Sequence, residues 1–587
     1  MDTGSTGFDT ATTTTADNGD ASSDAADTST VSSTSNDTSP IEPTDTITQT
    51  ADTDTGTSSL DTASSDPSQN ADSDTTTNRD NYSGTDMVDT SMADSESEPI
   101  CGTEITDELF CVDNRIVKLD ACNTVVETIE NCNNIKRTCY QKQCVCPDGW
   151  TGDSCTVPII YVNAGIIADA GNNGRSWEQA FANLPKALEE AERQNEAEIW
   201  VAKGRYVPGN SRESTFQLTE DVHLYGGFAG DERLMAERDF ELNETILDGD
   251  INGDDSASSF TMHSENAYHV VIGAEGALID GVTIRGGNAN GTGYPDNCGG
   301  GVLLEGTAMS IANCHVIENY AGTGGGMHLS SVSSLRLSNC RFEHNDATYD
   351  GGGLYEATSN LNVTDCTFIN NSALGDGGGG YGGGAALASG TSHFSRCEFI
   401  ENHAQAGGGL YARDSSASIE NCLFSTNEAV SGAAVGTNTT TPGKTTTVQN
   451  CTVVNNYCED SSAPIRVYGS ATVTNSIVWG NRNVGGANPQ LEVANNTSTI
   501  TASDSIVEGG CPAVTEVMCD NVLNDTPGFT DPSTDNWRLS AGAFAVDAGD
   551  NQYVDSDETD LAGHSRIVDG DGDNSAIVDM GAYEFVP

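Results

Sequence analysis

Short runs of alternating apolar and polar residues recur about every 25 residues between residues 310 and 481. Each run is bounded by glycine and asparagine, which is typical of short β-strands separated by turns. When the runs are aligned, six of the seven repeats carry a cysteine in one common slot. The slot holds Cys314, Cys340, Cys366, Cys397, Cys422, Cys451 and then Ser476, so that successive spacings are 26, 26, 31, 25, 29 and 25 residues. This regularity predicts a solenoid in which each repeat forms one coil of parallel strands.

Two apolar slots flank the cysteine slot. The slot three residues before the cysteine holds Ile311, Leu337, Val363, Phe394, Ile419, Val448 and Val473. The slot two residues after it holds Val316, Phe342, Phe368, Phe399, Phe424, Val453 and Val478. In a strand these positions point to one face, and we expect that face to line the core.

Five residues after the cysteine slot, every repeat carries asparagine. The series is Asn319, Asn345, Asn371, Asn402, Asn427, Asn456 and Asn481. In a solenoid, equivalent residues stack about 4.8 Å apart, so their amides can hydrogen-bond from coil to coil. Asparagine also tolerates the left-handed turn conformation. Stacked cysteines have parallel Cβ vectors, which predicts free thiols rather than disulfides in this row.

The repeats resemble the right-handed parallel β-helix of pectin-lyase-like proteins. The sequences "GGGM", "GGGL", "FEHN" and "FIEN" resemble the paired signatures of polymorphic outer membrane protein repeats. The end of the chain, "AVDAGDNQYVDSDETDLAGHSRIVDGDGDNSAIVDMGAYEF", resembles the last segment of choice-of-anchor Q proteins. Together these resemblances cover residues 159–587. They imply an all-β fold and a bacterial surface protein.

A single amphipathic helix is expected near the start of the solenoid. Asn183 is suited to cap a helix over residues 184–194, and Pro185 fits the first turn. One face carries Leu184, Ala187, Leu188 and Ala191. A helix at this position would cover the first coil and protect its open edge.

Residues 1–100 consist almost entirely of Ser, Thr, Asp, Ala, Gly and Asn. Such a segment buries too little apolar surface to offset its ordering entropy, so we expect a disordered tether. Its composition resembles the spacers of bacterial surface lipoproteins. An N-terminal lipid anchor is therefore one hypothesis for attachment, although no lipobox cysteine precedes the tether.

Residues 101–156 contain eight cysteines, which predicts a small module stabilised by disulfides. Zinc is disfavoured because the segment has no CxxC pair and no histidine. Its end, "CVCPDGWTGDSC", resembles the second half of an EGF-like module. The resemblance implies a disulfide between Cys146 and Cys155 and leaves the remaining connectivity open.

The net charge of −64 argues against nucleic acid and anionic membranes as partners and favours divalent cations or simply a well-solvated surface. No apolar run is long enough to span a membrane. The start "MDTGSTGFDT" shows no secretion signal, which conflicts with the cysteine-rich module. We therefore expect a processed chain or a misplaced start codon, and an extracellular or outer cell-surface location.

Two Asp-rich loops are candidate Ca²⁺ sites. The first has the alternating oxygens of an EF-type loop but carries Ser259 where a closing Glu belongs. The alternative is that Asp-Gly pairs simply form turns. The candidate ligands are Asp248, Asp250, Asn252 and Asp254 in the first loop, and Asp569, Asp571 and Asp573 in the second.

No residue is assigned a catalytic role. His344, next to Glu343 and Asp346, occupies a slot that varies between coils, which indicates a solvated turn. The hydrolase motifs NTD and GHG are missing from the sequence, and no acidic–basic pair is constant along the repeats. We therefore predict a structural or adhesive surface protein that binds polysaccharide or a protein on a host or neighbouring cell. The alternative is a Ca²⁺-dependent polysaccharide lyase or hydrolase.

The predicted organisation has four parts. They are the tether at residues 1–100, the EGF-like module at 101–156, the right-handed parallel β-helix at 157–505 and its closing segment at 506–587.

Overall fold

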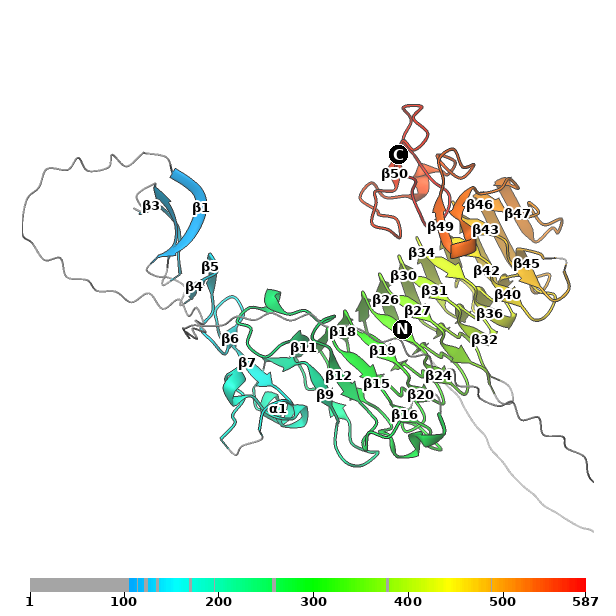
Figure 1. Ribbon diagram of the computed structural model, residues 1–587. Coiled ribbons are helices and arrows are strands. Elements are labelled where there is room, and N and C mark those ends of the chain that lie inside the picture. The colour runs from blue at the N-terminus through cyan, green and yellow to red at the C-terminus, as the bar shows by residue number, and fades with distance from the viewer. Residues whose placement is uncertain are drawn as a thin grey trace, which may run out of the picture. The chain divides into compact units, whose positions relative to one another are not determined.

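The computed structural model describes residues 105–587 except 113–114, 121–124, 133–136, 168–170, 195, 256–259, 376–378 and 487. The predicted tether, Cys101, Cys122 and Ser259 lie outside the described residues. Within the described part, the backbone of a right-handed parallel β-helix confirms the predicted fold (Figure 1).

One large sheet supplies two columns of parallel strands, which we call the first and second columns. The first column contains β7 (Val157–Val162), β8 (Ala197–Ala202), β11 (Val222–Phe228), β14 (Leu278–Asp280), β18 (Met309–Ala312), β22 (Leu335–Ser338), β26 (Asn360–Thr364), β30 (Thr391–Ser395), β34 (Ser416–Glu420), β38 (Thr446–Gln449), β42 (Ser470–Thr474), β46 (Thr499–Val507) and β47 (Val517–Leu523). The second column contains β9 (Gly204–Tyr206), β12 (Thr245–Asp248), β15 (Thr283–Arg285), β19 (His315–Ile317), β23 (Arg341–Glu343), β27 (Thr367–Ile369), β31 (Glu398–Ile400), β35 (Leu423–Ser425), β39 (Thr452–Val454) and β43 (Ile477–Trp479).

Two further parallel sheets complete each coil. The eight-stranded sheet contains β16 (Asn288–Ala289), β20 (Tyr320–Ala321), β24 (Asp346–Ala347), β28 (Ser372–Ala373), β32 (His403–Ala406), β36 (Glu428–Ser431), β40 (Tyr457–Cys458) and β44 (Arg482–Asn483). The ten-stranded sheet contains β10 (Phe216–Gln217), β13 (Val271–Ile272), β17 (Val302–Glu305), β21 (Met327–Ser330), β25 (Leu354–Ala357), β29 (Ala385–Ala388), β33 (Leu410–Arg413), β37 (Val435–Asn438), β41 (Ile465–Tyr468) and β45 (Leu491–Val493). The chain therefore visits the first column, the second column, the eight-stranded sheet and the ten-stranded sheet in turn.

Left-handed residues make the two corners that bound each second-column strand. In one coil, Asn339 precedes Cys340 with φ of 51°, and His344 precedes Asn345 with φ of 50°. Equivalent residues in the other repeats also have positive φ. The ladder asparagines themselves do not, so the expectation that they adopt the left-handed turn is wrong. Their retention is explained by hydrogen bonding instead.

The asparagine ladder is continuous. Asn345 Nδ2 donates to Asn371 Oδ1 at 2.9 Å, and Asn371 Nδ2 donates to Asn402 Oδ1 at 3.0 Å. Each amide also binds backbone, as when Asn371 Nδ2 donates to the Phe342 carbonyl at 2.9 Å. At the far end, Asn481 Nδ2 donates to Gln490 Oε1 at 2.8 Å. The ladder satisfies fully buried polar atoms that would otherwise destabilise the corner.

The inward-facing slots form the core. Phe342, Phe368, Phe399 and Phe424 stack face to face, with ring centroids 4.6–4.9 Å apart. The cysteines of the predicted row are free and buried, which confirms the prediction of free thiols. Burial raises the pKa of the Cys314 and Cys422 thiols well above the ordinary value, so both stay neutral.

The predicted helix covers the first coils. Helix α1 spans Leu184–Ala191 and is shorter than expected; Asn183 caps it by accepting from the Lys186 amide at 3.1 Å. Its apolar face packs against β7 and β8. The short 3₁₀ helices are η2 (Trp177–Gln179), η3 (Met235–Glu237), η4 (Phe260–Glu265), η5 (Pro532–Thr534) and η6 (Asn551–Tyr553).

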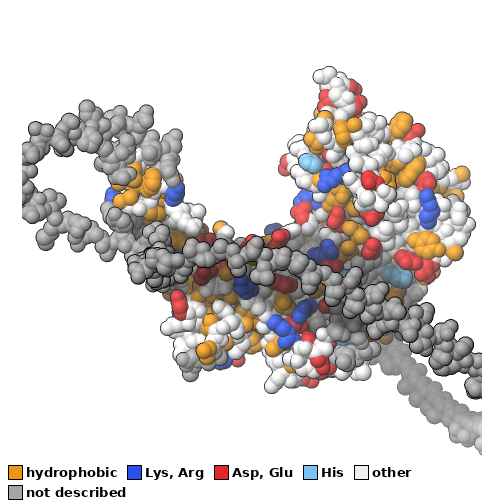
Figure 2. All heavy atoms as spheres, viewed as in Figure 1, with side chains coloured by type: hydrophobic (Ala, Val, Ile, Leu, Met, Phe, Trp, Pro, Cys, Tyr) orange, Lys and Arg blue, Asp and Glu red, His pale blue; other side chains and the backbone are white. Residues whose placement is uncertain are grey.

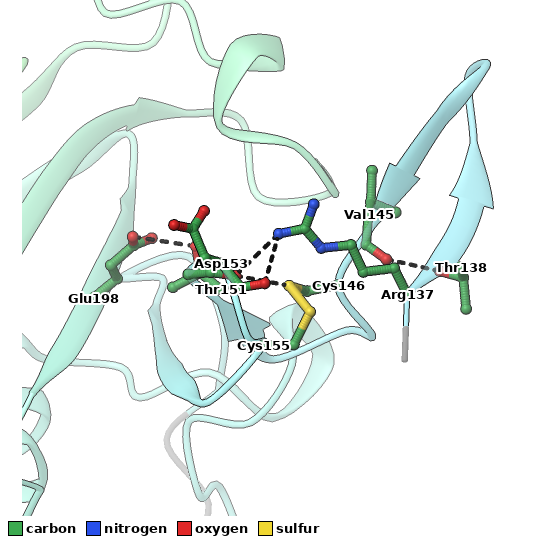
Figure 3. Close-up of a disulfide and its surroundings, with 9 residues drawn as sticks. Arg137, Thr138, Val145, Cys146, Thr151, Asp153, Cys155 and Glu198 are labelled. Atoms are coloured by element: carbon green, nitrogen blue, oxygen red, sulfur yellow. Dashed lines mark hydrogen bonds between the residues drawn. A yellow bond between two sulfur atoms is a disulfide. The ribbon is translucent and has the colours of Figure 1, made fainter. Parts of the chain in front are cut away.

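A disulfide-rich region precedes the coils. Its strands are β1 (Ile105–Val112), β2 (Arg115–Asp120), β3 (Val125–Asn131), β4 (Thr138–Tyr140), β5 (Gln143–Val145) and β6 (Trp150–Thr151). The disulfides join Cys111 to Cys139, Cys132 to Cys144 and Cys146 to Cys155. Figure 3 shows Thr151 reaching toward Glu198 on β8, where Thr151 Oγ1 donates to Glu198 Oε1 at 3.2 Å. This hydrogen bond links the region to the first coils.

The last residues fold back onto the outside of the second column. This C-terminal segment, residues 524–587, contains β48 (Phe529–Asp531), β49 (Asn536–Leu539), β50 (Ile567–Val568) and β51 (Ile577–Val578). The Ala582 amide donates to Thr452 Oγ1 at 2.9 Å, and the Asp550 amide donates to Asn475 Oδ1 at 2.9 Å. The segment therefore lies against the side of the last coils.

Candidate functional site

Stacked polar residues, mostly uncharged, form the outer face of the first column between β26 and β38, and we call this part the polar face. Glu420 on β34 is a charged exception: its Oε1 accepts from Ser418 Oγ at 2.6 Å and lies 3.8 Å from His393 Nδ1. Alternate residues of β26, β30, β34 and β38 point outward because the intervening residues fill the core. The middle row, in register across the strands, is Asn362, His393, Ser418, Thr447, Thr472 and Thr501. A neighbouring row contains Asn360, Thr391 and Ser416.

The polar face is hollowed between β26 and β38. The hollow has a volume of about 340 Å³ and is lined by hydroxyl and amide side chains, among them Asn362, Thr391, Ser418 and Thr447. His393 is the one ionisable side chain among its lining residues. Glu420 borders the hollow without being one of its lining residues. Since the chain carries a net charge of −64, a hollow lined mainly by hydroxyl and amide groups still differs from the average surface. Elsewhere acidic and basic side chains are interspersed, as the visible parts of Figure 2 show.

The first Asp-rich loop is rearranged relative to the EF-type expectation. Asp248 is almost fully buried, and its Oδ2 accepts from Arg205 Nε at 2.7 Å and from Arg285 Nη2 at 2.8 Å. Its Oδ1 accepts from the Asp250 amide at 3.1 Å. Both oxygens are therefore engaged by the protein. Asn252 is exposed and lies outside the carboxylate cluster.

The same loop brings together Asp250, Asp254, Asp255 and Glu265, each with a carboxylate oxygen within 4.8 Å of the others. Asp255 Oδ1 and Glu265 Oε1 are buried and have no hydrogen-bond partner. Burial raises the pKa of Asp255, and the charges of Asp250 and Asp254 raise it further. Sequence reasoning missed Asp255 and Glu265 because their spacing from Asp250 and Asp254 along the chain does not follow the EF-hand pattern.

The second Asp-rich loop is more exposed. Asp547, Asp569 and Asp571 have carboxylate oxygens within 4.8 Å of one another, whereas Asp573 is outside this group. Asp569 Oδ1 accepts from the Gly572 amide at 2.8 Å and Asp573 Oδ1 accepts from the Ser575 amide at 2.7 Å. These are turn-stabilising contacts of the kind expected for Asp-Gly sequences.

The C-terminal segment contains a buried charge network. Arg566 is 1% exposed, and its Nη2 donates to the carbonyls of Asp579 and Gly581 at 2.9 and 3.0 Å. Its Nε lies 3.5 Å from Glu584 Oε1. Burial raises the pKa of Glu584 to about 9; the Arg566 charge opposes this effect and the Asp579 charge adds to it, so Glu584 is protonated at neutral pH. This network holds the segment together.

His344 is a turn residue, as the sequence indicates. Its side chain is 51% exposed, and its Nδ1 lies 3.5 Å from Glu343 Oε1. Asp346 belongs to β24 in the eight-stranded sheet, and burial raises the pKa of its carboxyl to about 6. His344 therefore lies at a solvent-exposed turn.

Comparison with known proteins agrees with the fold. A family model described as "Right handed beta helix region" matches residues 251–399. No curated protein sequence matches the chain. Among solved structures, pectate lyase Pel9A is 12% identical, covers 73% of this chain and 96% of its own, and has a TM-score of 0.44.

Two other solved structures also match this chain. The surface protein and adhesin PfbA of Streptococcus pneumoniae is 11% identical, covers 61% of this chain and 95% of its own, and has a TM-score of 0.34. A tailspike protein from Acinetobacter baumannii bacteriophage Fri1, a capsular polysaccharide depolymerase, is 12% identical, covers 62% and 63%, and has a TM-score of 0.31. Over the described residues, helices that could cross a membrane are not found.

Proposed function

We propose that the chain is an extracellular or cell-surface β-helix protein that binds a neutral polysaccharide along the polar face. The hollow, lined mainly by hydroxyl and amide groups in a strongly acidic chain, is the observation that carries this proposal. Hydroxyl and amide side chains form hydrogen bonds with sugar hydroxyls, and no ionised group has to be desolvated for these bonds to form. Acidic polysaccharides are disfavoured because the surrounding protein repels them.

The geometry of the polar face suits an extended sugar chain. Its rows repeat with the strand spacing of about 4.8 Å, and a chain of pyranose rings advances by a similar length per ring. Rigid strands hold the polar groups in place before the ligand arrives, which reduces the entropy lost on binding. A role in adhesion follows if the polysaccharide belongs to a host or neighbouring cell. A lipid anchor on the tether would then display the coils at the surface.

Binding to insoluble neutral polysaccharides, compared with binding to pectate and alginate, tests this function. The variant Thr391→Ala/Ser418→Ala removes two hydroxyls from the hollow and is expected to weaken binding about tenfold, since each hydrogen bond contributes about 0.5–1.5 kcal/mol. The matched control, Thr367→Ala/Ser372→Ala, removes one threonine and one serine hydroxyl outside the hollow. Equal losses in the two variants, or preference for the acidic polymers, would contradict the proposal.

We also propose that Ca²⁺ binds the cluster of Asp250, Asp254, Asp255 and Glu265. The two buried carboxylate oxygens without partners favour a cation there, because an unsatisfied buried carboxylate is costly and Ca²⁺ prefers oxygen ligands. Glu265 would contribute the closing carboxylate that the EF-type pattern lacks. Asp547, Asp569 and Asp571 form a second and more exposed candidate.

Calorimetric titration with Ca²⁺ and thermal unfolding with and without a chelator test this site. At a Ca²⁺ concentration about 100 times Kd, binding stabilises the fold by about 2.7 kcal/mol. Asp250→Asn/Asp254→Asn is expected to abolish this gain, while Asp525→Asn, an exposed acid outside both loops, leaves it unchanged. Loss of the Ca²⁺-dependent stabilisation only in Asp569→Asn/Asp571→Asn would assign the ion to the second loop. A titration in which Ca²⁺ produces no heat would refute both candidate sites.

A further inference from the structure

A second hollow lies on the outer face of the second column, where the loop before β12 overhangs β15, β19 and β23. Its volume is about 330 Å³, and the sequence patterns did not reveal it. The lining includes Glu241 and Glu244 from the loop, and Thr283, His315 and Arg341 from three successive coils. Strand register places the last three side by side.

His315 in this hollow is held by a carboxylate. Its Nε2 lies 3.1 Å from Glu343 Oε2, which also accepts from Arg341 Nε at 2.6 Å. The hydrogen bond from Arg341 holds the pKa of Glu343 below its ordinary value, so Glu343 is ionised. An ionised carboxylate can only accept a hydrogen bond, so Nε2 carries the hydrogen and donates it, and Nδ1 carries the lone pair.

The imidazole is neutral at physiological pH. Burial lowers the pKa of His315, although the charges of Glu343 and Glu244 oppose the effect and Arg341 reinforces it. Its side chain is 33% exposed, so the ring is accessible from the hollow. A neutral imidazole oriented by a carboxylate is the arrangement of a general base.

We propose that this hollow hydrolyses carboxylic esters, with O-acyl esters of neutral sugars as the substrate class. His315 Nδ1 takes a proton from a water molecule while the water oxygen forms a bond to the acyl carbon. The carbonyl oxygen becomes an oxyanion that Arg341 stabilises. The bond between the acyl carbon and the sugar oxygen then breaks, and the sugar oxygen takes the proton from His315. The products are a sugar hydroxyl and a carboxylic acid, which ionises.

Two other reactions fit the hollow less well. Glycoside hydrolysis requires a protonated carboxylic acid beside the leaving oxygen, and Glu343 does not supply it because this carboxylate is ionised and shared by Arg341 and His315. Elimination from a uronate would bring an anionic polymer against Glu241 and Glu244, which repel it. Ester hydrolysis needs a base and one oxyanion donor, and both line the hollow. The reaction does not depend on binding at the polar face.

Release of p-nitrophenol from p-nitrophenyl acetate and of acetate from acetylated xylan tests the site. His315→Ala is expected to lower kcat/KM about 100-fold, the contribution typical of a general base. In the unmodified chain, the rate should rise with pH through a pKa below the ordinary histidine value. Glu343→Gln, which removes a positioning residue, should lower kcat and move that rise to lower pH because the imidazolium loses its anionic partner.

Exposed histidines provide the controls, since free imidazole also cleaves activated esters. His403→Ala and His564→Ala, at exposed histidines outside both hollows, should retain full activity and the same circular dichroism spectrum as His315→Ala. If the unmodified chain is no faster than His315→Ala, or if the His403 and His564 variants lose as much activity as His315→Ala, the site is overturned. Cleavage of p-nitrophenyl acetate without release of acetate from xylan would overturn the assignment to sugar esters.

Discussion

The outward slots of the second column differ between the middle coils and the last coils. In β19 and β23 these slots hold His315, Arg341 and Glu343, which line or border a hollow open to solvent. In β35, β39 and β43 the equivalent slots hold residues that the C-terminal segment covers. They are Leu423, Val454, Ile477 and Trp479, packed against Trp537, Leu561, Met580 and Tyr583. The backbone is the same in both regions.

This difference shows that the fold determines the inward slots, whereas the outward slots depend on what lies against them. The inward slots keep apolar residues, thiols and asparagines from coil to coil because the neighbouring coils are alike. The outward slots accept charge where water reaches them and require apolar residues where another segment covers them. Chemistry is therefore to be sought in the outward slots of the uncovered coils.

The largest effect is expected when an inward polar slot is broken. Asn371→Ala removes the acceptor used by the Asn345 amide and side chain at 3.1 and 2.9 Å. Leaving these groups buried without partners should cost about 3 kcal/mol of unfolding free energy. Urea unfolding followed by circular dichroism measures the loss. Asn362→Ala, an outward asparagine on the polar face, should stay within about 0.5 kcal/mol of the unmodified chain. Similar losses of unfolding free energy in Asn371→Ala and Asn362→Ala would contradict the distinction between inward and outward slots.

A smaller effect is expected when outward slots are exchanged between the regions. Leu423→Thr gives a covered slot the threonine found at Thr367 and should cost about 2 kcal/mol through lost burial. The reciprocal change, Thr367→Leu, should alter stability by less than about 0.5 kcal/mol. Hydrogen exchange in residues 529–587 reports the first change, because release of the C-terminal segment precedes loss of the coils. Equal protection from hydrogen exchange in Leu423→Thr and Thr367→Leu would show that contacts outside the covered slot hold the C-terminal segment.

A change of pH tests how the C-terminal segment is held over the covered slots. The pKa of Glu584 is about 9 in the folded segment and near its ordinary value of 4.5 when unfolded. Between these values the folded form binds the extra proton, so stability of the segment falls as pH rises, by at most about 1.4 kcal/mol per pH unit. Above about pH 9 the dependence ends. Glu584→Gln should remove it, which proteolysis of the segment at pH 5 and pH 8 would measure. An unchanged pH dependence would place the titrating group elsewhere.

The coil was predictable because each inward slot repeats. The apolar, asparagine and cysteine slots recur in successive repeats even though the repeats differ in length. This recurrence identifies them in the sequence. The helix was predictable from Asn183 and its apolar face, although its length was overestimated. The eight- and ten-stranded sheets were less visible, since strands of two to four residues leave little periodicity to read.

The candidate sites were harder to predict because they join residues from different coils or loops. Nothing local marks His315, Glu343 and Glu244 as neighbours, since register and an overhanging loop bring them together. Asp248 matched a metal-binding pattern in sequence, yet Arg205 and Arg285 from the adjacent coils engage it. Such partners become visible only when the stacking order of the strands is known.

Unequal repeat lengths have a consequence for evolution and engineering. The spacings of 31 and 29 residues are accommodated between β28 and β29 and between β37 and β38, while the columns on either side keep their register. Extra residues at these corners cost only loop-closure entropy, which grows slowly with length. These two corners therefore offer insertion points at which a foreign peptide could be displayed without disturbing the coil stack.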